Sequence, residues 1–184
     1  MEQKMKPIAI IDVDETLWSF SRAFYNKVKE RGYNFPVPEE WDYWSIFWKW
    51  IPKEQCFPIF DEVHCDQCAY LPYKDAKEFL DFMHEHFYII IASHRDPKCE
   101  DELKKWMDGN RLKYDEIHTS FDKSVLFDKE GVSIVVDDNP ETLDKATMRG
   151  IVAIGLSRPW NKKRGYKLFP SLTAAKRFIE KDML

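Results

Sequence analysis

Five short, largely apolar runs recur along the chain, and amphipathic stretches separate them. The runs are Ile8–Val13, Phe87–Ala92, Glu116–Thr119, Val132–Val136 and Ile151–Gly155. Apolar runs of this length are typical of strands that are covered on both faces, and helical connections between them favour parallel pairing. The pattern therefore predicts an α/β domain with a Rossmann-like parallel sheet flanked by helices.

The connections between these runs have the apolar spacing of helices. Helices are expected over Tyr73–Glu85, Pro97–Met107, Pro140–Met148 and from Ser171 to about Lys181. The connection over residues 14–86 is far longer than a single crossover helix needs, so an insertion is expected. We expect a core at residues 1–17 and 72–184 and a small helical cap at residues 18–71, beginning with a helix at Ser19–Arg31.

The inserted segment is rich in aromatic residues, most densely over Trp41–Trp50. Trp41, Trp44 and Trp48 fall at helical spacing. Such a stripe more often packs in a core than binds a ligand. Trp18 and Phe20, directly after the first predicted strand, are better placed to face a substrate.

Composition excludes several classes of function. Only 6 of 184 residues are glycine, and none stands in a G-x-G-x-x-G or P-loop spacing, which excludes a glycine loop for nucleotide phosphates. The net charge of −4 gives no global attraction to nucleic acid or anionic lipid. The longest apolar run, Phe87–Ala92, is far shorter than the ~20 residues that span a bilayer. With no signal-peptide pattern at the start, a cytoplasmic protein is expected, with no membrane partner.

The 4 cysteines are Cys56, Cys65, Cys68 and Cys99. A chain of this size does not need disulfides for stability, so reduced thiols are expected. The segment His64–Cys68 superficially resembles a zinc site. Zinc needs four tetrahedral ligands, however, and the adjacent His64 and Cys65 do not readily reach one ion, so zinc is not favoured.

Acidic residues follow two of the predicted strands. Asp12 and Asp14 end the first strand, and Asp137 and Asp138 end the fourth. Ligands of open α/β sheets lie beyond the carboxyl ends of the strands, and side chains two apart in an extended chain point the same way. If the two strands are neighbours, these carboxylates converge, and such a group needs a raised pKa or a shared cation. Hard oxygen ligands suit Mg²⁺.

The other strand ends are also polar. Ser93, His94 and Arg95 follow the second strand, and Lys123 lies ahead of the fourth. A nucleophilic carboxylate, metal-binding carboxylates, a hydroxyl and a lysine together predict a site for phosphoryl transfer.

These motifs, in this order, resemble those of the haloacid dehalogenase superfamily of Mg²⁺-dependent phosphohydrolases. The matching elements are Asp12-Val13-Asp14-Glu15-Thr16, Ser93, Lys123 and Asp137-Asp138. Asp122-Lys123-Ser124-Val125 and the VVDDNP segment at residues 135–140 are most similar to the 5′(3′)-deoxyribonucleotidase-like group. Many superfamily members have glycine where Glu15 stands.

The resemblance implies a role for each matching residue. Asp12 would attack phosphorus, and Asp14 would act as general acid and base, which calls for a raised pKa. Mg²⁺ would bind Asp12, the backbone carbonyl of Asp14, and Asp137 or Asp138, a choice left open. Lys123 would offset negative charge, with Lys129 as a competing candidate. The expected phosphate-binding or substrate-binding residues are Ser93, His94 through its amide, Arg95, Trp18 and Thr16, the last chiefly as a support for the loop.

The expected substrate is a small phosphomonoester, a nucleoside monophosphate above all. A polynucleotide 3′-phosphatase is kept as an alternative because of a local run of basic residues, although nucleic acid is not favoured as a partner. The run comprises Arg158, Lys162, Lys163, Arg164 and Lys167. The usual explanation for such a run is a solvated face. A catalytically silent binding module with the same fold is the second alternative. The sequence indicates no oligomeric state.

Overall fold

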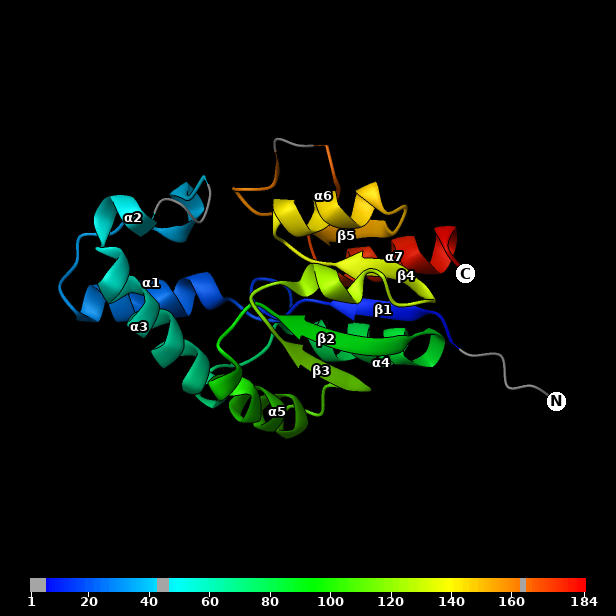
Figure 1. The fold of residues 1–184 in the computed structure, drawn as a ribbon, viewed down its shortest axis with the longest axis horizontal. Coiled ribbons are helices and arrows are strands. Elements are labelled where there is room, and N and C mark those ends of the chain that lie inside the picture. The colour runs from blue at the N-terminus through cyan, green and yellow to red at the C-terminus, as the bar shows by residue number, and fades with distance from the viewer. Residues whose placement is uncertain (1–5, 43–46, 163–164) are drawn as a thin grey trace.

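The computed structural model describes residues 6–42, 47–162 and 165–184. Six parallel strands form one sheet in the order β3-β2-β1-β4-β5-β6 (Figure 1). Their bounds are Ile8–Ile11 (β1), Tyr88–Ser93 (β2), Glu116–Thr119 (β3), Val132–Val136 (β4), Val152–Leu156 (β5) and Lys167–Phe169 (β6). The predicted Rossmann-like α/β class is confirmed. The sixth strand was not predicted, because its three residues are too short to show a pattern.

Both faces of the sheet are buried, which explains the apolar strand sequences. Ala9 and Ile11 pack in the larger core cluster with Leu103 of α5 (Glu100–Gly109) and Ile179 of α7 (Leu172–Asp182). Ile10 points to the other face and packs in a second cluster beneath α6 (Pro140–Met148). The first cluster also includes α4 (Ala76–His86), which contacts α7.

In the described part of the chain between β1 and α4 lie the helices α1 (Phe20–Glu30), α2 (Phe47–Trp50) and α3 (Lys53–Cys65), and the short turns η1 (Pro38–Glu40) and η3 (Gln67–Ala69). These helices lie together beyond the carboxyl ends of the strands, at the left of Figure 1. We call α1, α2 and α3 the helical insertion. Helix α3 was not predicted, and it accommodates Pro58 in its interior.

Among the described residues, no helix is long and apolar enough to cross a membrane.

Of the predicted tryptophan stripe, Trp41 is fully buried and donates its Nε1 hydrogen to the carbonyl of Pro36 at 2.9 Å. It contacts Phe24 and Phe47 edge to face, so it packs in the core of the insertion. Trp44 and the side chain of Trp48 fall outside the described residues.

The expectation of reduced thiols is wrong for two of the cysteines. Cys65, at the end of α3, forms a disulfide with Cys99 in the turn η4 (Pro97–Cys99), and their Cα atoms are 5.1 Å apart. Chain length gave no reason for a disulfide, but folding brings the end of the insertion against the turn after β2. Cys56 and Cys68 are free thiols.

The Cys65–Cys99 disulfide should stabilise the protein substantially. It joins residues 34 apart, and closing a loop of that length in the unfolded chain is worth about 3–4 kcal/mol. Cys65→Ser should therefore lower the free energy of unfolding by about that amount in urea denaturation. Cys68→Ser, which removes an exposed free thiol, is the matched control and should change it by less than about 0.5 kcal/mol. Equal stability of Cys65→Ser and the wild type would contradict the expectation.

Candidate active site

The two acidic motifs meet because β1 and β4 are hydrogen-bonded neighbours. Ile11 pairs with Val136, and the amide of Asp12 donates to the carbonyl of Val136 at 2.9 Å. Asp137 follows directly, and Gly155 of β5 lies against its backbone. A Cβ at Gly155 would be 2.0 Å from the carbonyl oxygen of Asp137, so only glycine fits there. The predicted convergence of the two strand ends is therefore present.

Lys123 reaches the same point from the turn η5 (Lys123–Leu126). Its Nζ donates to Asp12 Oδ1 and to Asp137 Oδ2, both at 2.6 Å, and all three side chains are buried. The two carboxylates outweigh the effect of burial and raise the pKa of Lys123, which keeps it charged. The competing candidate, Lys129, instead pairs with Glu116 at the surface.

Three buried carboxylates form a compact group at the strand ends. Asp12, Asp137 and Asp138 each offer an oxygen within 4.8 Å of the others, and Asp12 Oδ2 is buried without a hydrogen-bond partner in the described part of the chain. Burial, together with the neighbouring carboxylates, raises the pKa of Asp12 to about 8 despite Lys123. Burial and Asp12 also raise the pKa of Asp138 well above its ordinary value.

The carboxylate of Asp14 lies apart from that group and accepts four hydrogen bonds. Trp18 Nε1 lies 2.8 Å and Arg95 Nη2 3.1 Å from Oδ1, and His64 Nε2 lies 3.0 Å and Ser93 Oγ 3.4 Å from Oδ2. Burial by itself would raise the pKa of Asp14, but Arg95 and His64 outweigh it and hold the pKa below its ordinary range. The expected raised pKa is thus wrong in this arrangement.

The other predicted binding residues divide between the cavity and its supports. His94 and Arg95 line the cavity. Ser93 is fully buried and accepts a hydrogen bond from Arg95 Nε at 2.6 Å. Trp18 and Thr16 are buried and do not line the cavity. The expectation that Trp18 faces the substrate is wrong, because its indole turns inward to Asp14.

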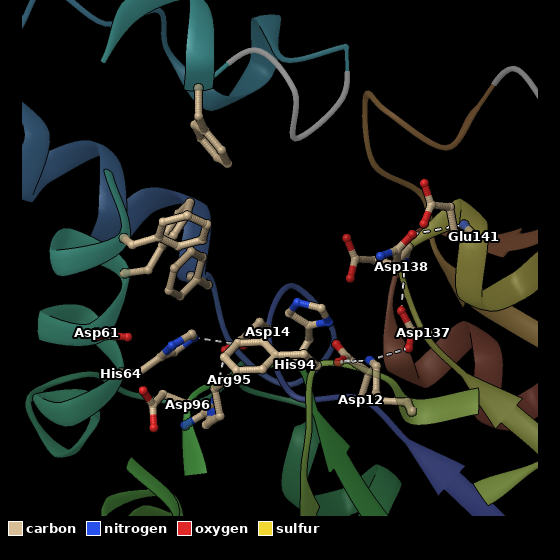
Figure 2. Close-up of a pocket in the computed structure, with 17 residues that line it drawn as sticks. Asp12, Asp14, Asp61, His64, His94, Arg95, Asp96, Asp137, Asp138 and Glu141 are labelled. Carbon is tan, nitrogen blue, oxygen red and sulfur yellow. Dashed lines mark hydrogen bonds and ion pairs between the residues drawn. The ribbon is translucent and has the colours of Figure 1, made fainter. Parts of the chain in front are cut away.

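A cavity of about 660 Å³ opens between the strand ends and the helical insertion (Figure 2). Asp12, to which Lys123 donates, lies at its floor, with His64 and Asp61 on one side and Asp138 and Glu141 on the other. Besides Asp61 and His64, the insertion contributes four aromatic rings to the lining: Phe20, Phe47, Phe57 and Phe60. Phe121, between β3 and η5, also lines the cavity.

Two polar residues of this region were not predicted from the sequence. His64 lies at the end of α3 and Gln67 in η3, and both are buried against the site. Gln67 Oε1 accepts from Arg95 Nη1 at 2.6 Å. Their hydrogen-bond partners are Asp14 and Arg95, which are distant in sequence, so no local sequence pattern indicates these contacts.

Glu15 occupies a left-handed backbone conformation, with φ of 62°. That conformation favours glycine, which fits the glycine common at this place in the resembling superfamily. Its buried carboxylate accepts from the amide of Ser21 at 2.6 Å and lies 3.3 Å from Arg158. Arg158 also donates to Tyr73.

Arg158 therefore does not belong to a solvated basic face, contrary to the expectation for that run. Lys162 and Lys167 are both exposed, as that expectation has it, and Lys167 lies over the ring of Phe178 at 4.8 Å. Lys163 and Arg164 fall outside the described residues.

No family model and no curated protein matches this sequence. Solved structures do match the fold. A haloacid dehalogenase-like hydrolase from Streptococcus pneumoniae superposes with a TM-score of 0.63 at 16% identity, over 83% of this chain and 85% of that one. The chain has the haloacid dehalogenase fold.

Other structures with the haloacid dehalogenase fold differ in what they bind. The YfnB protein of Bacillus subtilis, bound to magnesium, has a TM-score of 0.58 at 11% identity, over 83% of this chain and 89% of that one. The L-2-haloacid dehalogenase of Xanthobacter autotrophicus, with chloropropionic acid covalently bound, has a TM-score of 0.58 at 12% identity, over 97% and 100% of the two chains.

The donors that this haloacid dehalogenase fold brings together fit a small, hard divalent cation. All three members of the buried group are carboxylates, and Asp12 Oδ2 has no hydrogen-bond donor among the described residues. Lys123 supplies one positive charge to this group, too little for all three carboxyls to ionise together. A cation such as Mg²⁺, bound by oxygen ligands, would relieve the remaining repulsion.

Without metal, the stability of this site should depend on pH. The pKa of Asp12 is about 8 in the fold, above its value of 3.8 in an unfolded chain. A raised carboxyl pKa stabilises the fold at low pH, and that stabilisation is lost as pH rises through the folded pKa. His64 has a lowered pKa, so its opposing effect lies largely below pH 7.

In EDTA, the melting temperature should therefore be lower at pH 8 than at pH 7. The associated loss is up to about 1 kcal/mol for each such carboxyl. Saturating Mg²⁺ should remove most of this dependence, because the cation keeps the carboxylates ionised in the fold. Differential scanning fluorimetry at both pH values, with and without Mg²⁺, measures the effect. A rise in stability from pH 7 to pH 8 in EDTA would contradict it.

Proposed function

We propose that this chain is a Mg²⁺-dependent phosphomonoester hydrolase that works through an aspartyl-phosphate on Asp12. The observation that carries the proposal is the buried group of Asp12, Asp137 and Asp138 beside Lys123, at the floor of the cavity. A cation held there would withdraw charge from the phosphoryl group and lessen its repulsion from the nucleophile. Lys123, fixed and desolvated, offsets charge at the same place.

Two steps follow from this arrangement. In the first, an oxygen of Asp12 bonds to phosphorus while the bond to the ester oxygen breaks, and Asp14 gives its proton to the leaving oxygen. In the second, Asp14 takes a proton from a water molecule that attacks phosphorus, which releases inorganic phosphate and restores Asp12. The negative charge of a substrate phosphate raises the pKa of a neighbouring carboxyl. That effect favours the protonated Asp14 needed in the first step.

For the metal, we infer a ligand set of Asp12, Asp138 and the backbone carbonyl of Asp14. Both oxygens of Asp137 already accept hydrogen bonds, from Lys123 and from the amide of Asn139 at 2.8 Å. Asp138 is held at Oδ2 by Trp160 Nε1 at 2.7 Å, which leaves Oδ1 to ligate. The amide of His94, a residue that lines the cavity, is proposed to bind a phosphate oxygen, and the buried Ser93 is proposed to support this loop through Asp14 and Arg95.

The aromatic side chains that line the cavity support a nucleoside monophosphate as the substrate. Flat nucleobases stack on aromatic rings with little dependence on base identity. Phe57 and Phe60 of α3, Phe20 of α1 and Phe121 all line the cavity. A base between these rings would leave the phosphate over Asp12.

The proposal is tested by measuring phosphate release from 5′- and 3′-nucleoside monophosphates, glycerol phosphate and 4-nitrophenyl phosphate, in Mg²⁺ and in EDTA. We expect release only in Mg²⁺, with higher kcat/KM for the nucleotides than for glycerol phosphate. Acid quenching with a ³²P-labelled substrate should trap a phosphoenzyme that hydroxylamine cleaves. Because dehalogenases share the fold, chloride release from L-2-chloropropionate is measured in parallel. Chloride release without phosphate release would overturn the proposal.

A further inference from the structure

His64 is the residue of the helical insertion that enters the floor of the site. It is the penultimate residue of α3, its exposed fraction is 5%, and its Nε2 lies 3.0 Å from Asp14 Oδ2. Figure 2 shows the imidazole reaching across the cavity edge to Asp14. The imidazole donates this bond while the Asp14 carboxylate is ionised, and the ring tautomer sets the roles when Asp14 carries a proton.

Several contacts fix the imidazole in this orientation. Its ring lies against Phe20, with centroids 4.7 Å apart. The next residue, Cys65, is joined by the disulfide to Cys99, so the end of α3 is tied to the turn that follows Arg95. A side chain buried and held on two sides loses little further freedom when it orients a partner.

The same segment also holds the second partner of Asp14. Gln67 accepts from Arg95 Nη1 at 2.6 Å, while Arg95 Nη2 donates to Asp14 Oδ1 at 3.1 Å. Residues 64–67 thus fix one donor to each oxygen of the Asp14 carboxylate, directly through His64 and indirectly through Arg95. The carboxylate can neither rotate nor tilt without breaking a buried hydrogen bond.

We propose that His64 is a positioning residue for the reaction, which holds the carboxylate of Asp14 in the orientation from which it exchanges a proton with the leaving oxygen. This inference rests on the proposed function. Loss of His64 should then weaken proton transfer and leave the attack of Asp12 on phosphorus largely intact. Alkyl esters leave as strongly basic alkoxides and need the proton, whereas 4-nitrophenolate leaves readily without one.

The experiment compares His64→Ala and His64→Gln with wild type on two esters, the best alkyl or nucleoside phosphate and 4-nitrophenyl phosphate. For His64→Ala we expect kcat on the alkyl ester to fall by about 10²-fold. The loss on 4-nitrophenyl phosphate should be less than about 5-fold, and KM for both should change little. His64→Gln retains an N–H donor and should recover about 10-fold on the alkyl ester.

Two controls separate positioning from a structural role. His84→Gln changes a histidine that pairs with Asp115, away from the cavity. It should leave the rates of hydrolysis of both esters unchanged. Imidazole added to His64→Ala can enter the adjoining cavity and should restore part of the alkyl-ester rate. Melting temperatures of all variants are measured alongside, and His64→Gln preserves the comparison if His64→Ala is poorly folded.

Equal losses on the two esters, or no loss on either, would overturn the inference. Asp14→Asn shows which proposal has failed. Suppose that the wild type is active and that Asp14→Asn loses more activity on the alkyl ester than on 4-nitrophenyl phosphate. If the His64 variants show no such difference, the positioning role of His64 alone is wrong. If the wild type hydrolyses neither ester, the proposed function is wrong and the inference falls with it.

Discussion

Replacing Asp12 with asparagine should abolish phosphate release and yet leave a folded protein that, in EDTA at pH 8, is no less stable than the wild type. An amide oxygen is too weak a nucleophile to form the covalent intermediate, so kcat should fall by about 10⁵-fold or more. Stability should be preserved because burial and the neighbouring carboxylates already disfavour the ionised form of Asp12 and raise its pKa to about 8. An asparagine side chain has the same shape as the neutral, protonated form of Asp12, so the substitution should fit the buried site.

Phosphate release, trapping of the phosphoenzyme and urea denaturation in EDTA measure the two halves of this prediction. Asp128→Asn is the matched control, since Asp128 is exposed and pairs with Arg149 away from the cavity. It should retain full activity. Mg²⁺ should raise the melting temperature of the wild type and raise that of Asp12→Asn less, because one ligand is weakened. Turnover that survives in Asp12→Asn would exclude Asp12 as the nucleophile.

The fold and the floor of the site could be predicted because both follow from local patterns. Buried parallel strands need apolar residues on both faces, and Ile8–Ile11 and Val132–Val136 have them. Once these strands pair, as β1 and β4 do, the acidic residues after them must meet at one edge of the sheet. Residue type and position were therefore enough to bring Asp12 and Asp137 together.

The surroundings of Asp14 could not be predicted, because they depend on long-range packing. His64 is 50 residues from Asp14 along the chain, and Arg95 is 81 residues from it. Arg95 after β2 is equally compatible in sequence with a solvated side chain. Its charge beside Asp14, together with His64, outweighs the effect of burial and lowers the pKa of Asp14, the reverse of the expected direction. The Cys65–Cys99 disulfide was missed for the same reason, since it depends on where α3 ends.

Replacing Lys123 with methionine should have the opposite effect on stability from Asp12→Asn. Lys123 Nζ lies 2.6 Å from both Asp12 and Asp137, and it provides the positive charge inside the buried group of three carboxylates. Removing one partner of a buried ion pair leaves uncompensated charge and costs about 3–5 kcal/mol. In EDTA at pH 8, where these carboxyls are driven toward ionisation, Lys123→Met should lose about that much stability.

Activity should also fall in Lys123→Met, by about 10²-fold to 10³-fold, because the desolvated positive charge beside the nucleophile is lost. Lys129→Met is the matched control: Lys129 pairs with Glu116 at the surface, and such pairs are worth about 0–1 kcal/mol. Urea denaturation and phosphate release are measured for both variants. Mg²⁺ should restore more stability to Lys123→Met than to the wild type, since the cation then offsets charge that lysine no longer does. If Lys129→Met loses more activity than Lys123→Met, the assignment of Lys123 is wrong.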